Sequence, residues 1–274
     1  LWTVKDEAAK DLEGTLRKVY AAGFREIEFA GFYGKTAAEI GALLKGIGFS
    51  LVSMHAGASD IAKSGAQILA DAKTLGLRYV VCSSPGVSPD KDKLPWEEKM
   101  KAVDLNDWKW NADLFNKFGK QVSDAGMKFG YHNHTAEFKT FEGKTAFEHL
   151  FGSTDPKHVH IELDVGWVHV AKQDPIAILN QYKDRVIALH VKDFGASPAD
   201  GKEPGSVALG EGVIDYWGNG TVRGRSVLLW FLCENAALLS GTGFLLTGHL
   251  APFIVQAIAL VGLAWFAPSR IAAE

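Results

Sequence analysis

The sequence predicts an α/β protein, a single-domain (β/α)₈ barrel, and three observations favour this fold. Short apolar runs alternate with helical patterns along the chain, as expected for a parallel sheet with helices outside it. Polar residues stand at the C-terminal ends of nearly all the apolar runs, which is where such barrels carry their active sites. The length of 274 residues also suits one barrel.

The predicted strands are six apolar runs that follow "LWT", a remnant of a truncated first strand. They cover residues 25–30, 49–55, 77–83, 127–134, 158–165 and 185–193. Before four of them a glycine ends the preceding helix, as in "KGIGFSL" and "DAGMKFG". A doubly wound sheet is the alternative, but "FAGFYGKT" lacks the GxGxxG spacing of a dinucleotide-binding turn.

Helices are expected from about Thr36, over 59–75 and near 102–125. Thr36 is followed three residues later by Glu39, the spacing of a capping box. Gly48 ends this first pattern, as glycine commonly does at helix C-termini.

Composition limits the classes of partner and of structural site that the protein can have. The net charge is −3 and no block of Lys or Arg stands out, which argues against nucleic acid as the main partner. Cys82 and Cys233 both lie in apolar runs without a CxxC spacing, so neither a disulfide framework nor a zinc ribbon is indicated. The chain starts without Met or a leader-like apolar segment, so we expect a cytoplasmic protein with an incomplete N-terminus.

Histidines and carboxylates gather at the ends of successive predicted strands. Taken singly, each has a structural explanation: a core histidine, a helix cap at Asp164, or an ion pair at Lys192. Taken together they converge on the barrel axis, and buried polar groups without partners are costly. A divalent cation such as Mn²⁺, Co²⁺, Fe²⁺ or Zn²⁺ suits this mixture of imidazole and carboxylate. The residues concerned are Glu28, His55, His132, His134, Asp164, His190 and Lys192.

Four motifs resemble the sugar phosphate isomerase/epimerase family, the xylose-isomerase-like TIM barrels. They are "LEGTLRKVYAAGFREIEFAGFYGKT", "YHNHTAEF", "IELDVGWVHVAKQDP" and "LHVKDF", and the resemblance covers about residues 1–216. It implies isomerisation or epimerisation of a sugar or keto-sugar by proton transfer next to a carbonyl. It also implies one divalent metal ion, Mn²⁺ above Mg²⁺, Co²⁺ or Zn²⁺, held by Glu, Asp, His and Glu from the last four strands.

Carried over by position, the resemblance implies a specific set of site residues. The metal ligands are His132, Asp164, His190 and Glu234, with His132 standing where the family often has the Glu of "ENH" and with His134 and Glu137 as its alternatives. The catalytic residues are Glu234 as the base, Lys192 and His132. The substrate-binding residues are Glu28, His55, His134 and Trp167.

The C-terminal segment departs from the resemblance after Tyr216. "VLLWFLCEN" has the shape expected of the last strand, but residues 250–267 carry no charge at all. Three interpretations compete: a membrane anchor, a buried closing helix, or a corrupted end such as a shifted reading frame, which we favour. We therefore expect a barrel over 1–234 and an atypical apolar tail over 235–274.

Other functions remain open at this point. A metal-dependent lyase, such as an inosose-type dehydratase, needs the same fold, metal and enolate. A DNA-repair endonuclease of the superfamily needs more metal ligands and a basic groove, which the sequence lacks. A barrel with a defective last strand would bind a sugar without converting it. In each remaining case the expected partner is a small sugar or keto-sugar, and a homo-oligomer is possible.

Overall fold

The computed structural model describes residues 1–198 and 203–214. They fall into two compact units, the first made of residues 1–175 and 179–191. The second contains residues 176–178 and the described residues from Lys192 onward. The expected boundary after residue 234 and the predicted last strand lie outside the described residues.

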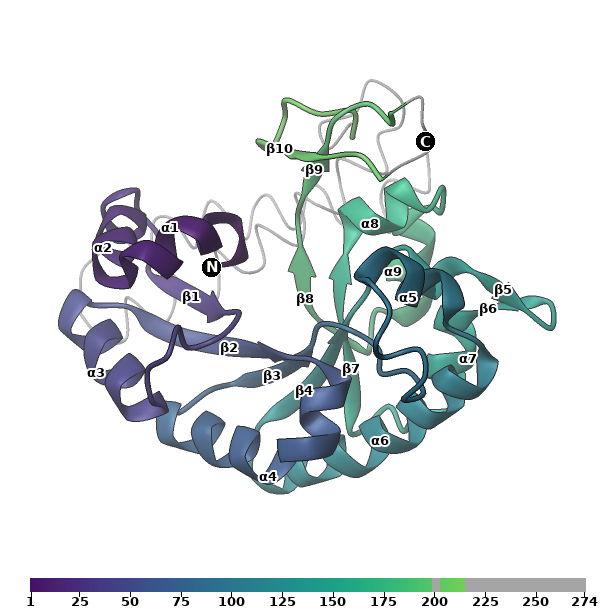
Figure 1. The fold of residues 1–274 in the computed structure, drawn as a ribbon, viewed down its shortest axis with the longest axis horizontal. Coiled ribbons are helices and arrows are strands. Elements are labelled where there is room, and N and C mark those ends of the chain that lie inside the picture. Colours follow the sequence, from purple (N-terminus) through teal and green to yellow (C-terminus); the bar gives the residue numbers. More distant parts are fainter. Residues whose placement is uncertain (199–202, 215–274) are drawn as a thin grey trace, which may run out of the picture. The chain divides into compact units, whose positions relative to one another are not determined.

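The first unit is built on a curved six-stranded sheet of order β1-β2-β3-β4-β7-β8 (Figure 1). All neighbouring strands are parallel, so their C-terminal ends lie at one edge. Each of the six apolar runs predicted from the sequence forms one of these strands. They are β1 (Glu26–Phe29), β2 (Ser50–Ala56), β3 (Tyr79–Cys82), β4 (Lys128–His132), β7 (Val159–Asp164) and β8 (Val186–His190).

The segment expected as the remnant of a first strand has a different structure. Trp2–Val4 form a 3₁₀ helix, η1, which runs directly into α1 (Lys5–Lys10) and is followed by α2 (Leu12–Ala21). Asp6 and Glu7 lie in the first turn of α1, where negative charge favours a helix N-terminus. The helical pattern at the start of the chain is stronger than the strand signal, which only three residues carry.

Helices α3 (Ala37–Ile47), α4 (Ala58–Leu75), α6 (Leu105–Asp124) and α7 (Ala146–Gly152) follow one another along the outer side of the sheet (Figure 1). The capping box predicted at Thr36 and Glu39 is confirmed, and Gly48 ends α3 with a φ of 105°. The remaining elements are α5 (Trp96–Ala102), η2 (Ala136–Phe138), β5 (Thr140–Phe141), β6 (Lys144–Thr145), α8 (Val165–Val170), α9 (Pro175–Tyr182), β9 (Asp193–Phe194) and β10 (Ser206–Val207).

An aromatic core joins α6 to the outer face of β4. The ring of Phe115 lies 5.5 Å from that of Phe129 and 5.2 Å from that of Tyr131, and all three side chains are fully buried. Because side chains alternate along a strand, Gly130 and His132 lie on the opposite face of β4. The helix packing therefore turns His132 toward the inside of the curved sheet.

Gly119 of α6 lies close to the backbone just before β7, and it gives a stability prediction. A Cβ added there would lie 2.4 Å from the backbone oxygen of His158. We expect Gly119→Ala to lower the free energy of unfolding by about 1–3 kcal/mol, as overpacking does. Gly46 of α3 is exposed with nothing near its would-be Cβ, so Gly46→Ala should raise it by about 0.5–1 kcal/mol. Urea unfolding measures both, and equal stability of the two variants would contradict the predicted packing.

Within residues 1–198 and 203–214, no helix is long and apolar enough to cross a membrane. The uncharged run 250–267 lies outside this part of the chain.

Candidate functional site

Six imidazole and carboxylate side chains gather at the C-terminal edge of the first unit's sheet. They come from five strands: Glu28 from β1, His55 from β2, His132 from β4, Glu162 and Asp164 from β7, and His190 from β8. Strand register explains the grouping, because His132 is the ladder partner of Glu162 and His190 that of Asp164. Sequence reasoning placed five of the six at the site and gave Glu162 no role.

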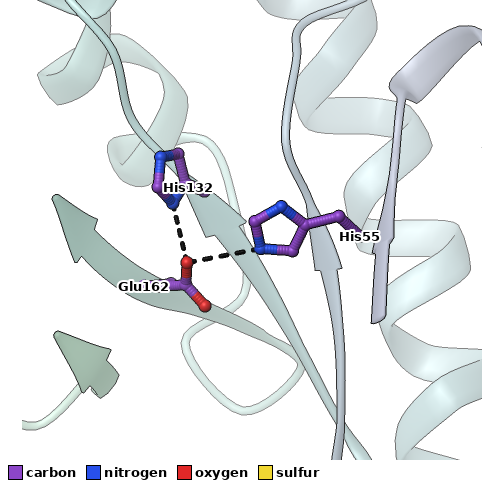
Figure 2. A group of neighbouring side chains, drawn as sticks. All are labelled: His55, His132 and Glu162. Carbon is purple, nitrogen blue, oxygen red and sulfur yellow. Dashed lines mark hydrogen bonds and ion pairs between the residues drawn. The ribbon is translucent and has the colours of Figure 1, made fainter. Parts of the chain in front are cut away.

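Glu162 is the centre of this cluster. Its Oε1 lies 2.7 Å from Nδ1 of His132, 3.4 Å from Nε2 of His55 and 3.5 Å from Nδ1 of His190. Figure 2 shows the first two contacts. Burial alone raises the pKa of Glu162, but the three imidazoles together hold it well below its ordinary value. Glu162 is therefore an ionised carboxylate, and it lies at the centre of the cluster.

His55 is paired with a second carboxylate, Glu28. Its Nε2 lies 2.8 Å from Oε1 of Glu28, close enough for an ion pair although no well-aligned hydrogen bond forms at this nitrogen. Ser53 donates its hydroxyl to the other oxygen of Glu28. Burial lowers the pKa of His55, but Glu162 and Glu28 outweigh it and raise the pKa to about 9. Without a metal, His55 therefore holds a proton at neutral pH.

The two carboxylate oxygens of Asp164 have different environments. Oδ1 accepts a hydrogen bond of 2.9 Å from the backbone N–H of Trp167 and so caps α8. Oδ2 is buried without a hydrogen-bond partner, and Nε2 of His132 lies 3.4 Å away. A buried carboxylate oxygen in this state is costly, and a cation would satisfy it.

Asn133 holds the ends of β4 and β7 beside each other. Its side-chain Nδ2 donates to the backbone oxygen of Asp164 at 3.2 Å, and its Oδ1 accepts from the Asp164 N–H at 2.9 Å. The amide thus continues the ladder by one step beyond His132. This exchange fixes His132 and Asp164 as neighbours.

Three overlapping groups of these side chains could hold a metal ion. They are His132–Asp164–His190, His55–His132–Glu162 and Glu28–Glu162–His190, and in each group the possible ligand atoms lie within 4.8 Å of one another. The first group contains three of the four expected ligands, and the fourth, Glu234, lies outside the described residues. Two imidazoles and the Asp164 carboxylate, whose Oδ2 has no hydrogen bond, fit a divalent cation.

Aromatic rings lie next to this group. The ring centre of His134 is 4.9 Å from that of His132 and 5.6 Å from that of Trp167. His134 and Trp167, two of the four predicted substrate-binding residues, are therefore near the cluster. Glu137, the alternative ligand, belongs to none of the three metal groups. Its carboxylate accepts hydrogen bonds from the Tyr131 hydroxyl at 2.5 Å and the His134 N–H at 2.9 Å.

Trp96 lies near the cluster and was not singled out by sequence reasoning. Its ring centre lies 6.2 Å from that of His134, and the side chain is about half exposed. Lys91, which pairs with Asp104 at 2.6 Å and Asp107 at 2.7 Å, anchors the preceding loop to α6. The only sequence signal was an aromatic residue after a proline in a polar loop. This signal does not show which residue the ring faces.

Lys192 belongs to the second unit. Its Nζ lies 5.2 Å from the ring centre of Phe194. The next residue, Asp193, is buried and accepts hydrogen bonds from the N–H groups of Gly210 and Gly212, both at 3.0 Å. A catalytic role for Lys192 remains a prediction.

Comparison with known proteins identifies relatives of the chain. A sequence profile of the xylose isomerase-like TIM barrel family matches residues 16–218. An inosose dehydratase from Clostridium beijerinckii is 31% identical over 155 residues, which cover 52% of this chain and 51% of that protein. One from Bacillus velezensis is 25% identical over 194 residues, covering 68% and 64%. The chain thus spans between about half and two thirds of the length of these relatives.

Solved structures show the same fold. A sugar phosphate isomerase/epimerase from Parabacteroides distasonis superposes with a TM-score of 0.62 at 21% identity, covering 78% of this chain and 81% of that one. The IolI protein with a bound zinc atom superposes with a TM-score of 0.54 at 17% identity, covering 80% and 81%. The profile match covers most of the chain, and the parallel sheet with outer helices agrees with it. The chain therefore belongs to the xylose isomerase-like TIM barrel family.

Proposed function

We propose that this protein is a divalent-metal-dependent enzyme that moves a proton next to the carbonyl group of a keto-sugar or keto-polyol. The observation that carries this proposal is the convergence of His132, Asp164 and His190 around a buried carboxylate oxygen that has no hydrogen bond. A divalent cation bound there would polarise the substrate carbonyl and stabilise the negative charge that develops on its oxygen.

The described residues have separable roles in this proposal. His132, Asp164 and His190 hold the cation, with Glu234 as the fourth ligand if the last strand forms as predicted. The pair of His55 and Glu28 can hold a proton and pass it on, because an imidazole and a carboxylate 2.8 Å apart share it readily. The pair is therefore the acid–base candidate among the described residues.

Two reactions can follow the first proton transfer. If the proton returns to the neighbouring carbon or to the other face, the product is an isomer or epimer. If a hydroxyl group leaves from the carbon next to the carbanion, one water is lost and the enzyme is a dehydratase. The inosose dehydratases among the curated relatives support the second outcome for this chain. A protonated His55 would serve a departing hydroxyl group in that case.

The test begins with the protein loaded with Mn²⁺, Mg²⁺, Co²⁺ or Zn²⁺ in separate samples. Each sample is incubated in D₂O with a panel of ketoses, their phosphates and a keto-inositol. We expect deuterium at the carbon next to the carbonyl, detected by mass spectrometry and NMR. Loss of one water marks a dehydratase, and a new isomer marks an isomerase. A folded, metal-loaded protein that exchanges no deuterium with any of these substrates would refute the proposal.

Trp96 is expected to contribute to substrate binding through its ring. We expect Trp96→Ala to raise KM about three- to tenfold with little change in kcat, because aromatic contacts contribute about 0.5–1.5 kcal/mol. Phe24 is also exposed, but it precedes β1 and so lies at the opposite edge of the sheet. Steady-state kinetics of Phe24→Ala provide the control, and an unchanged KM in Trp96→Ala would remove Trp96 from the site.

A further inference from the structure

Glu162 occupies a place in the cluster that metal binding alone does not explain. It is buried and contacts three imidazoles through a single oxygen, Oε1. Yet the group formed by His132, Asp164 and His190 does not include it. On β7, Glu162 precedes Asp164 by two residues and pairs with His132 across the ladder. It therefore lies on the same face as Asp164 but one step further from the strand end.

We propose that Glu162 is a positioning residue that fixes which nitrogen of His132 and of His190 is free to bind the metal, and that it is not itself a ligand. This inference rests on the metal site of the proposed function. It means that Glu162, the residue at the centre of the cluster, orients the two histidines.

The tautomer of His132 is the basis of this inference. A neutral imidazole carries one N–H donor and one lone pair. An ionised carboxylate only accepts hydrogen bonds, so Glu162, 2.7 Å from Nδ1 of His132, requires the proton on Nδ1. The lone pair is then on Nε2, the atom that lies 3.4 Å from the unpaired Oδ2 of Asp164. Nε2 and Oδ2 are the two atoms a shared cation would need.

The same reasoning applies to His190. Its Nδ1 faces the same Oε1 at 3.5 Å, which leaves Nε2 as the nitrogen available for a metal. One carboxylate oxygen on β7 thus selects the tautomer of two histidines, which lie on the strands on either side of it, β4 and β8. Carboxylate partners of metal-binding histidines commonly orient the ring and raise its basicity, and their loss typically costs about 10–100-fold in metal affinity.

The contact with His132 also argues against Glu162 as a ligand. A cation bound at Oε1 would have to lie among the three imidazole nitrogens that already surround this oxygen. It would displace the 2.7 Å hydrogen bond to His132. At Asp164, by contrast, a cation would satisfy an oxygen that lacks a hydrogen bond.

The direct test is ¹⁵N NMR of the histidine rings in the metal-free protein, at a pH where the rings are neutral. We expect the wild-type His132 ring to carry its proton on Nδ1. In Glu162→Gln the isosteric amide can donate as well as accept, so we expect a mixture of the two tautomers. Glu28→Gln is the matched control, because it removes the carboxylate beside His55 and should leave the His132 tautomer unchanged.

Co²⁺ distinguishes positioning from ligation. We expect Glu162→Gln to bind Co²⁺ about 10–100-fold more weakly, with an unchanged visible spectrum at saturation because the ligand set is the same. A changed spectrum would make Glu162 a ligand and overturn the inference. A wild-type His132 ring with its proton on Nε2 would also overturn it, without need of a variant. If the wild type binds no metal, the proposed function fails, and the tautomer measurement still decides the role of Glu162.

Discussion

Replacing Asp164 with asparagine is expected to lower affinity for the divalent metal by at least about a hundredfold, above the range typical of residues that only support a ligand. The reason is that the two carboxylate oxygens of Asp164 have different roles. Oδ1 caps α8 through the Trp167 N–H, and the buried Oδ2 has no hydrogen bond. Asparagine caps helices as well as aspartate does, so the substitution keeps the cap and removes only the negative charge. Equilibrium dialysis followed by metal analysis measures the effect.

The comparison needs a second carboxylate variant and a test of folding. Asp124 is exposed and pairs with Lys120 within α6, so Asp124→Asn should bind metal like the wild type. Circular dichroism should show the wild-type fold for Asp164→Asn, and deuterium exchange into substrate should be lost with the metal. If Asp164→Asn retains one tightly bound metal ion, the site lies in another of the three groups.

The fold was predictable because its signals are local. A glycine that ends a helix just before an apolar run, as in "KGIGFSL" and three other places, is a signal carried by neighbouring residues. Parallel strands place their C-terminal ends at one edge, so His132, Asp164 and His190 could be grouped without coordinates. The prediction that "LWT" is the remnant of a strand was wrong, because three residues carry too little pattern to outweigh the helix that follows them.

The contacts within the site were not predictable in the same way. The ladder register shifts next to Glu28 and again next to Glu162, and counting alternate residues cannot foresee such irregularities. Alternation placed Glu162 on the face of Asp164, but only the register shows that its partner is His132. Trp96 reaches His134 through a loop whose course depends on contacts with α6.

Lowering the pH from 8 to 6 is expected to weaken metal binding by about fiftyfold, the largest effect that needs no mutation. A ligand histidine must be neutral to bind a metal. Burial lowers the pKa of His132, but Asp164 and Glu162 outweigh it and raise the pKa to about 8. Below that pH a proton occupies the ring and must be displaced by the metal. Each further decrease of one pH unit therefore lowers the metal affinity about tenfold for each proton displaced. Calorimetry in buffers of different ionisation enthalpy should show proton release on binding.

The stability of the metal-free protein should change with pH in the opposite direction. A histidine whose pKa is higher in the folded protein than in the unfolded chain adds stability that is fully present below the unfolded value of about 6.5. This contribution is lost as the pH rises through the folded values of about 8 for His132 and about 9 for His55. The histidine cluster therefore stabilises the metal-free fold most in weakly acidic solution.

These two dependences combine into one measurement, the rise in Tm on adding metal. Stabilisation by a ligand grows with its concentration relative to Kd, so it should be small at pH 6 and large at pH 8.5. Over the same range the metal-free Tm should lose the contribution of His55 and His132. Asp164→Asn keeps both histidines and is expected to show no rise at either pH. An equal rise in the wild type at both pH values would mean that the metal displaces no proton, and His132 would then not be a ligand.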